Sequence, residues 1–199
     1  MDYYQIIADN FESTIQTIAM SVDQLADPIA RASQLMVEAL LEDRKILTCG
    51  NGVDAALAQL FSSLLLSRYE YERPALPAMA LTGDGASLTA IAQTSGLGET
   101  YSRQLRAVGQ PGDVLLCISS GGGASNLLRA VQAAHARNMT VVALSNSSDH
   151  ELGNLIRAED VVLQIQATRH PRVVELQIMA LHCICELIDH SLFGSYNQE

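Results

Sequence analysis

The sequence predicts an α/β fold, a three-layer αβα domain in which helices cover both faces of a five-stranded parallel sheet. Two observations support this fold class. Five short runs of aliphatic and β-branched residues lack polar alternation, as strands covered on both faces do. Helical patterns separate these runs, and alternation of strands with helices favours a parallel sheet. The five runs are KILTCG at 45–50, PAMALTG at 77–83, DVLLCISS at 113–120, MTVVALSN at 139–146 and DVVLQIQA at 160–167.

Two amphipathic helices are expected before the first strand. Apolar residues recur every three or four positions from Tyr4 to Leu25, which is the period of a helix. Asp27 and Pro28 are expected to end this helix and to begin a second one, which reaches about Leu41. Asp accepts hydrogen bonds from first-turn N–H groups, and Pro is tolerated at the first helical position. The apolar stripe suits packing either into a multi-helix assembly or onto its own domain.

The predicted organisation is a single domain over residues 1–199. Residues 1–43 form helices used in oligomerisation, and residues 44–199 form the αβα core with a C-terminal helix. The C-terminal helix is apolar nearly all round, so we expect it to be buried in the domain or between subunits. The helices expected within 44–199 lie near 55–68, in two short pieces between 86 and 108, and near 124–137, 150–156 and 172–191.

The composition argues against two classes of protein. The formal net charge is −10 and no Lys/Arg cluster occurs, whereas direct binding of DNA or RNA needs a basic surface. The N-terminus has no basic segment followed by an apolar one, and no run of about 18 apolar residues follows, so we expect a cytoplasmic protein without a membrane span. Charged residues are only 17% of the chain, which indicates that further copies of the chain cover some apolar surface. The four cysteines are expected to be buried thiols.

Two turns that follow strands are candidates for a ligand site. CGNG at 49–52 follows the first strand, and a second run of small residues follows the third strand. In open parallel sheets, ligands bind beyond the carboxyl ends of the strands, where such turns meet. Hydroxyl groups and free backbone N–H groups there suit an anionic group such as phosphate. The candidate ligand-binding residues are Asn51, Gly52, Ser119, Ser120, Gly121, Gly122 and Gly123.

Several motifs together resemble the sugar isomerase (SIS) domain family. They are CGNG at 49–52, ERPALPAMAL at 72–81, VGQPGDVLLCIS at 108–119, MTVVALS at 139–145 and the C-terminal helix. Within that family the chain is similar to phosphoheptose isomerases and to their relatives, the DnaA initiator-associating proteins, over essentially its whole length. The resemblance implies a three-layer αβα fold, a homotetramer built with the N- and C-terminal helices, and pockets for phosphorylated sugars between subunits.

The resemblance also implies that the phosphate site is altered. In phosphoheptose isomerases a serine-rich turn of the form STSGNS holds the phosphate; the matching residues 119–124 here keep serines only at the first two positions. The serine that follows CGNG in that family is matched by Asp54. A unit charge pair about 4 Å apart is worth about 4 kcal/mol at an effective dielectric of about 20, against roughly 0.3–2 kcal/mol from a helix N-terminus. Asp54 therefore opposes a phosphate unless it points away or is protonated; alternatively, it caps the helix that starts at Ala55.

The positions that carry catalytic groups in phosphoheptose isomerases are mostly aliphatic here. The resemblance matches a histidine and a glutamate of that family to Leu60 and Leu64, and a glutamine and a histidine to Val174 and His182. Moving a proton between sugar carbons needs an acid and a base, and zinc needs at least three protein ligands. We therefore expect no metal and no other cofactor. His182 is the one catalytic candidate, the alternative being a core histidine.

The favoured interpretation is a non-enzymatic homotetramer similar to the DnaA initiator-associating protein, which binds the replication initiator DnaA and promotes its assembly at the origin. Leu192 and Phe193 are the candidate partner contacts, unless they fold back onto the last helix. One alternative is an active sedoheptulose 7-phosphate isomerase that uses His182 with Asp54. Another is a sensor that binds a phosphosugar at 119–123 without catalysis.

Overall fold

The computed structural model of the chain describes residues 2–194. Its strands are β1 Ile46–Cys49, β2 Ala78–Ala80, β3 Val114–Ile118, β4 Thr140–Asn146 and β5 Val161–Ile165. They form one sheet in the order β2-β1-β3-β4-β5, and all neighbouring strands within the described residues are parallel. Each strand lies within one of the predicted runs. The predicted α/β fold with a five-stranded parallel sheet is therefore confirmed.

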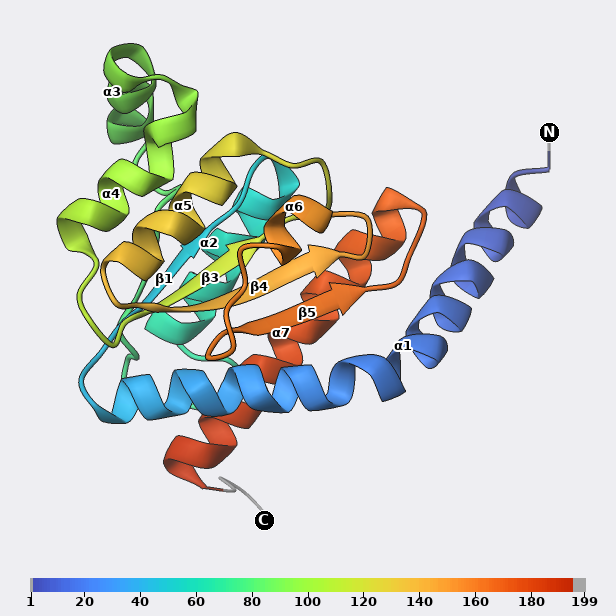
Figure 1. The fold of residues 1–199 in the computed structure, drawn as a ribbon. Coiled ribbons are helices and arrows are strands. Elements are labelled where there is room, and N and C mark those ends of the chain that lie inside the picture. The colour runs from blue at the N-terminus through green and yellow to red at the C-terminus, as the bar shows by residue number, and fades with distance from the viewer. Residues whose placement is uncertain (1, 195–199) are drawn as a thin grey trace.

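Helices cover both faces of this sheet (Figure 1). They are α1 Tyr3–Leu41, α2 Val53–Leu66, α3 Gly85–Ser95, the 3-10 turn η1 Leu97–Glu99, α4 Thr100–Val108, α5 Ser125–Ala136, α6 His150–Gly153 and α7 His170–Phe193. Residues of α1, α2 and α7 pack with one face of the sheet, and residues of α4 and α5 pack with the other. The helices predicted between the strands are present, with boundaries that differ by a few residues.

Strand residues alternate between the two helical layers. On β3, Leu116 and Ile118 face the layer of α1, α2 and α7, whereas Leu115 and Cys117 face the layer of α4 and α5. All four side chains are fully buried. Because both faces of the sheet are covered, its central strands have no solvent-facing positions, and this explains their continuous apolar sequence.

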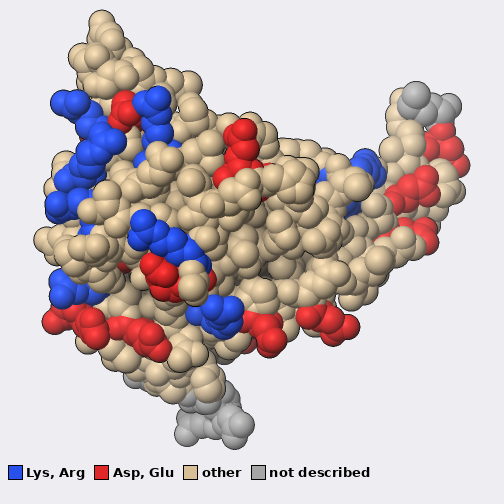
Figure 2. All heavy atoms as spheres, in the orientation of Figure 1, with Lys and Arg blue, Asp and Glu red and all other residues tan. Residues whose placement is uncertain are grey.

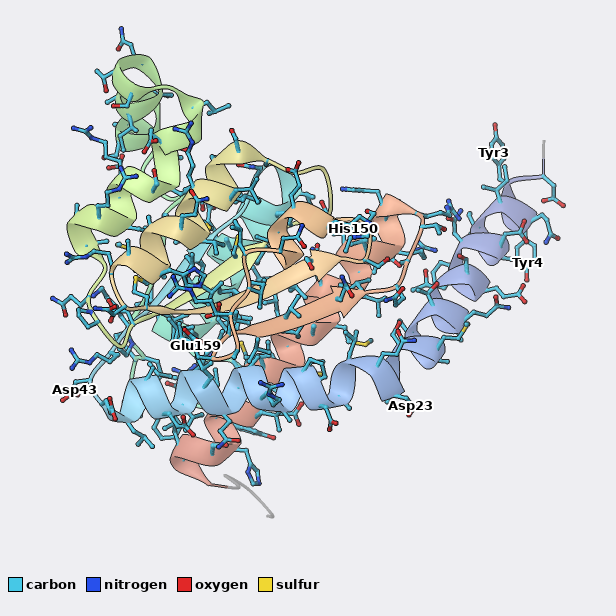
Figure 3. All side chains as sticks on the ribbon, viewed as in Figure 1. Tyr3, Tyr4, Asp23, Asp43, His150 and Glu159 are labelled. Atoms are coloured by element: carbon cyan, nitrogen blue, oxygen red, sulfur yellow. The ribbon has the colours of Figure 1, made fainter. Side chains whose placement is uncertain are left out.

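α1 is one continuous helix, whereas two helices were expected from the sequence. That expectation was wrong because Pro28 stands inside the helix and not at its boundary. Proline removes one backbone donor and crowds the carbonyl four residues earlier, which bends a helix when tertiary contacts hold it together. Figure 1 shows a bend in α1, and Figure 3 labels Asp23 beside it. After the bend, Ala32, Met36 and Leu40 are buried in the core.

The N-terminal half of α1 projects from the rest of the domain (Figure 1). We call residues 3–22 the arm. Its inner side contacts α7, since Thr14 donates a hydrogen bond to Glu175 and Arg172 donates one to the carbonyl of Asn10. Figure 2 shows acidic side chains along the arm. Its large exposed apolar side chains are Tyr3, Tyr4, Ile6, Ile7, Phe11, Ile15, Met20 and Val22.

α7 is the one helix among the described residues that is long and apolar enough to cross a membrane, by length and composition only. Its packing is that of a core helix, because one side of it contacts α1, α2 and the sheet. Leu181, Ile184 and Ile188 on that side are fully buried, whereas Met179 and Leu187 are exposed. The expected burial of this helix in the domain therefore holds for one side only.

Gly50 lets the first turn of α2 approach the end of β1. A Cβ atom built on Gly50 would lie 2.5 Å from the backbone oxygen of Asp54. We expect Gly50→Ala to lower the free energy of unfolding by about 1–3 kcal/mol, the usual effect of overpacking, measured by urea denaturation. Gly85→Ala is the matched control, because no heavy atom lies within 4 Å of its added Cβ. Equal losses in the two variants would contradict this account of the turn.

Candidate functional site

Two turns meet at the carboxyl edge of the sheet. β1 and β3 pair directly, with Cys49 opposite Cys117, so the residues that follow these two strands are neighbours. The turn after β1 leads into α2, and the turn after β3 leads into α5. This edge is where parallel sheets bind ligands. The two turns that the sequence singles out therefore form one candidate site.

A chain of three polar side chains links these turns to the start of α7. Oδ2 of Asp54 accepts hydrogen bonds from the backbone N–H of Ser120 at 2.8 Å and from its hydroxyl at 3.0 Å. The same hydroxyl lies 3.1 Å from Nε2 of His170. Because the hydroxyl proton points at the carboxylate, the hydroxyl oxygen is left to accept from an Nε2–H group of His170. A proton can therefore pass between imidazole and carboxylate through Ser120.

The Asp54 carboxyl group is buried and only half satisfied. Asp54 is 5% exposed, and its Oδ1 has no hydrogen-bond partner among the described residues. Burial raises the pKa of Asp54 above its usual range, while hydrogen bonds from Ser120 and the charge of His170 lower that pKa in part. A buried carboxyl with a free oxygen and a raised pKa takes up a proton more readily than an exposed carboxyl does. The alternative that Asp54 caps α2 is wrong, because Gly52 is the N-cap and Asp54 lies inside the first turn.

The glycine turn, Gly121–Gly123, offers backbone donors. The φ angles of its three residues are 130°, 105° and 53°, a region that other residues seldom occupy. None of its N–H groups donates to another residue within 2–194. The following helix, α5, has no side-chain cap, so its first turn adds further donors. Consecutive free N–H groups before a helix N-terminus form a cradle for an anion such as phosphate.

Two predicted ligand-binding residues are engaged within the chain. Ser119 donates its hydroxyl proton to Asp149, with the two oxygens 2.6 Å apart and buried. The amide of Asn51 makes a reciprocal pair with Asn126 and accepts from Tyr101, which also donates to the carbonyl of Gly50. These contacts hold the two turns in place. Of the predicted set, the N–H groups of the glycine turn remain open toward a ligand, whereas both donors of Ser120 are directed at Asp54.

The proposed pairing of Asp54 with His182 is wrong. His182 packs against Tyr69, with ring centroids 5.7 Å apart, and it lies about 18 Å along α7 from His170 at 1.5 Å per residue. His170 is the imidazole that reaches Asp54, through Ser120. His170 was not singled out from the sequence, although it follows β5 and so stands at the same edge of the sheet. Leu60, Leu64 and Val174, the aliphatic residues that the resemblance matches to catalytic positions, pack against the core.

The C-terminal pair predicted to contact a partner lies against the domain itself. Leu192 and Phe193 are partly buried and pack against the core. The guanidinium of Arg73 lies 5.9 Å from the centre of the Phe193 ring and donates a hydrogen bond to Asp189. The alternative that this pair folds back onto the helix describes the observed arrangement. No group of three His, Cys, Asp or Glu side chains that could hold a metal ion occurs within residues 2–194.

Comparison with known proteins gives the family. The sequence pattern of the SIS domain matches residues 10–146. The chain belongs to the SIS domain family. It is 44% identical over 195 residues to the phosphoheptose isomerase of Chromohalobacter salexigens. This alignment covers 98% of this chain and 99% of that protein.

Solved structures agree with this assignment. A phosphoheptose isomerase from Francisella tularensis superposes with a TM-score of 0.92 at 37% identity, over 96% of this chain and all of the other. A phosphoheptose isomerase from Neisseria gonorrhoeae gives a TM-score of 0.88 at 36% identity, over 94% of this chain and 98% of the other. The chain is therefore close to phosphoheptose isomerases in sequence and in structure.

These relatives contradict the interpretation as a non-enzymatic adaptor for DnaA. Proteins 43–44% identical over 98% of the chain are named phosphoheptose isomerases, which are enzymes. The adaptor interpretation, and with it the expectation that the chain is not an enzyme, was wrong. It relied on four family positions and missed a second set of proton-carrying groups, because Asp54 and His170 are distant in sequence and meet only in the fold.

The raised pKa of Asp54 predicts how stability depends on pH. The folded chain holds the Asp54 proton more tightly than the unfolded chain. The contribution of this proton to the free energy of unfolding is therefore present below the unfolded pKa of about 4 and is lost as pH rises through the folded pKa. Asp54→Asn cannot ionise. Its free energy of unfolding, relative to that of the wild type, should therefore be higher at about pH 8 than at about pH 4.

Urea denaturation of both proteins at the two pH values tests this expectation. Asp84→Asn is a control of opposite sign, because the hydroxyl and N–H of Ser87 lower the pKa of the exposed Asp84. The free energy of unfolding of Asp84→Asn, relative to that of the wild type, should not increase as pH rises. A pH dependence identical in wild type and Asp54→Asn would contradict the assigned pKa direction.

Proposed function

We propose that this chain is a sugar-phosphate isomerase that interconverts the aldose and ketose forms of a phosphorylated heptose, such as sedoheptulose 7-phosphate. Relatives of nearly equal length, named phosphoheptose isomerases, support the reaction class. The observation that carries the proposal is the convergence of a carboxylate, a hydroxyl and an imidazole beside a turn of free N–H groups.

The phosphate of the substrate is assigned to the glycine turn. This turn and the first turn of α5 follow the carboxyl end of β3, and a helix N-terminus favours negative charge. The hydroxyl of Ser120 adjoins this turn and donates to Asp54, whereas the hydroxyl of Ser119 donates to Asp149. A phosphate bound here leaves the sugar carbons free to extend toward His170.

His170 and Asp54 are assigned to the proton transfers. Isomerisation moves a proton from one sugar carbon to its neighbour and another between the two oxygens, so it needs a base and an acid. His170 is exposed at the mouth of the site and can act as the base. Asp54, buried and with a raised pKa, can act as the acid, directly or through Ser120. Leu60 and Leu64 cannot carry protons, which leaves this task to the Asp54–Ser120–His170 chain.

The chain is further proposed to act as a homotetramer, as the family resemblance implies, and in the cytoplasm. The exposed apolar side chains of the arm support self-association, and Figure 3 shows Tyr3 and Tyr4 pointing away from the domain. A groove of about 460 Å³ runs between α1 and α7 and offers an apolar surface to another copy. Its lining includes Ile18, Val22, Leu25, Ile29, Leu176, Met179 and Leu187.

The first prediction from this function concerns turnover. Wild-type protein at high concentration should isomerise sedoheptulose 7-phosphate in a coupled assay. His170→Ala should lower kcat by about 10²–10⁴, the usual contribution of a general base, with a smaller effect on KM. His182→Ala is the control and should keep wild-type turnover, because His182 packs against Tyr69 away from the site. Binding of the substrate by wild type without turnover above the enzyme-free blank would contradict the isomerase function.

The second prediction concerns assembly. Phe11→Glu, in the centre of the arm, should convert the tetramer to smaller species in light scattering after gel filtration, because it places a charge in an apolar contact. Leu97→Glu is a matched control on η1, since the two side chains are 69% and 71% exposed. Tetramers of equal stability in both variants would contradict the role of the arm.

A further inference from the structure

The donors that a phosphate needs at Ser120 are already in use. Oδ2 of Asp54 accepts both the N–H and the hydroxyl proton of Ser120, at 2.8 and 3.0 Å. A carboxylate oxygen and a phosphate oxygen accept the same charge-assisted hydrogen bonds, so they compete for these donors. The chain thus carries its own anion at the edge of the proposed phosphate cradle.

We propose that Asp54 is an internal anion that selects which ligands bind, and that a doubly charged group binds at Ser120 and the glycine turn only together with a proton on Asp54. The inference rests on the proposed function, because it concerns the same site. It makes Asp54 the residue that decides affinity for anions at this turn. It also couples ligand binding to proton uptake.

Burial explains why the competition is strong. Asp54 is 5% exposed, so water screens its charge little, and a second anion beside it meets nearly the full repulsion. The unpartnered Oδ1 offers a place for a proton. Once protonated, the carboxyl changes from a pure acceptor into a group with one donor, and repulsion of the ligand becomes a hydrogen bond to it. The raised pKa of Asp54 agrees with this use of Oδ1.

Three other titratable groups face this turn from neighbouring elements. His170, at the start of α7, contacts Ser120 and favours an anion when protonated. Asp149, before α6, accepts a hydrogen bond from Ser119. Glu151, in α6, approaches the glycine turn, because a Cβ on Gly123 would lie 2.6 Å from its Oε2. Neither Asp149 nor Glu151 takes a donor of Ser120, so these carboxylates repel an anion without competing for its hydrogen bonds.

Calorimetric titration with inorganic sulfate tests the inference, because sulfate stays a dianion throughout the pH range used. Wild type should bind sulfate more tightly as pH falls from about 8 to about 5. Titrations in buffers of different ionisation enthalpy should show uptake of about one proton per ion near pH 7. Asp54→Asn should bind sulfate about tenfold or more tightly near pH 7, with little proton uptake. Asp54→Ser, which restores a hydroxyl, should do the same.

Two variants separate Asp54 from its neighbours. Glu151→Gln removes a negative charge beside the same turn and should change affinity by less than about threefold, because it frees no donor of Ser120. His170→Gln should keep the larger part of the proton uptake, which would vanish if His170 were its source. Thermal melting of each variant checks that it is folded.

Sulfate affinity in Asp54→Asn and Asp54→Ser no higher than in wild type would overturn the inference, as would binding to wild type without proton uptake. Turnover of sedoheptulose 7-phosphate is measured on the same wild-type preparation. Tightened sulfate binding in the variants, with no turnover by wild type, removes the isomerase function and leaves the role of Asp54 intact. Turnover by wild type with unchanged sulfate binding in the variants supports the isomerase function and removes the proposed role of Asp54.

Discussion

One buried carboxylate organises the site. Asp54 stands in the first turn of α2 and accepts two hydrogen bonds from Ser120, so it joins the turn after β1 to the turn after β3. The approach is possible because residue 50 is glycine, where a Cβ would collide with the backbone of Asp54. The same side chain sets the protonation of the site and its tolerance of anions. Acid–base chemistry and ligand preference at this site therefore depend on the Asp54–Ser120 contact, in two turns that the Asn51–Asn126 pair also joins.

The fold was largely predictable because its signals are local. A strand covered on both faces must be apolar throughout, and β3 and β4 show this in consecutive residues of sequence. The course of α1 was not predictable from the sequence. Pro28 indicates a helix boundary in the sequence, but the helix continues through it because Ala32 and Met36 pack against the core. Whether a proline ends or bends a helix depends on contacts with residues far along the chain.

The location of the site was predictable from the sequence, but only some of its residues were. The turns after β1 and β3 could be located, because the carboxyl ends of neighbouring parallel strands meet at one edge. His170 could not be assigned, since it is 50 residues from Ser120 and its position depends on the path of the chain after β5. The inference from the aliphatic residues Leu60 and Leu64 to a protein without catalysis was wrong, because it assumed that proton-carrying groups occupy fixed positions. The fold shows that other side chains converge on the same turn.

Because the chain carries a net negative charge, binding of an anion depends on the hydrogen-bond donors within the site. A chain with a formal net charge of −10 repels an anionic substrate at long range, and only contacts within the site can reverse that repulsion. In the hydrogen bonds described around Ser120, the one group that can carry positive charge is the imidazole of His170. Backbone N–H groups supply the remaining attraction, and the carboxylate of Asp54 opposes it. A proton on Asp54 removes the repulsion between its buried carboxylate and a bound anion. Protonation of Asp54 and anion binding at this turn are therefore two parts of one equilibrium.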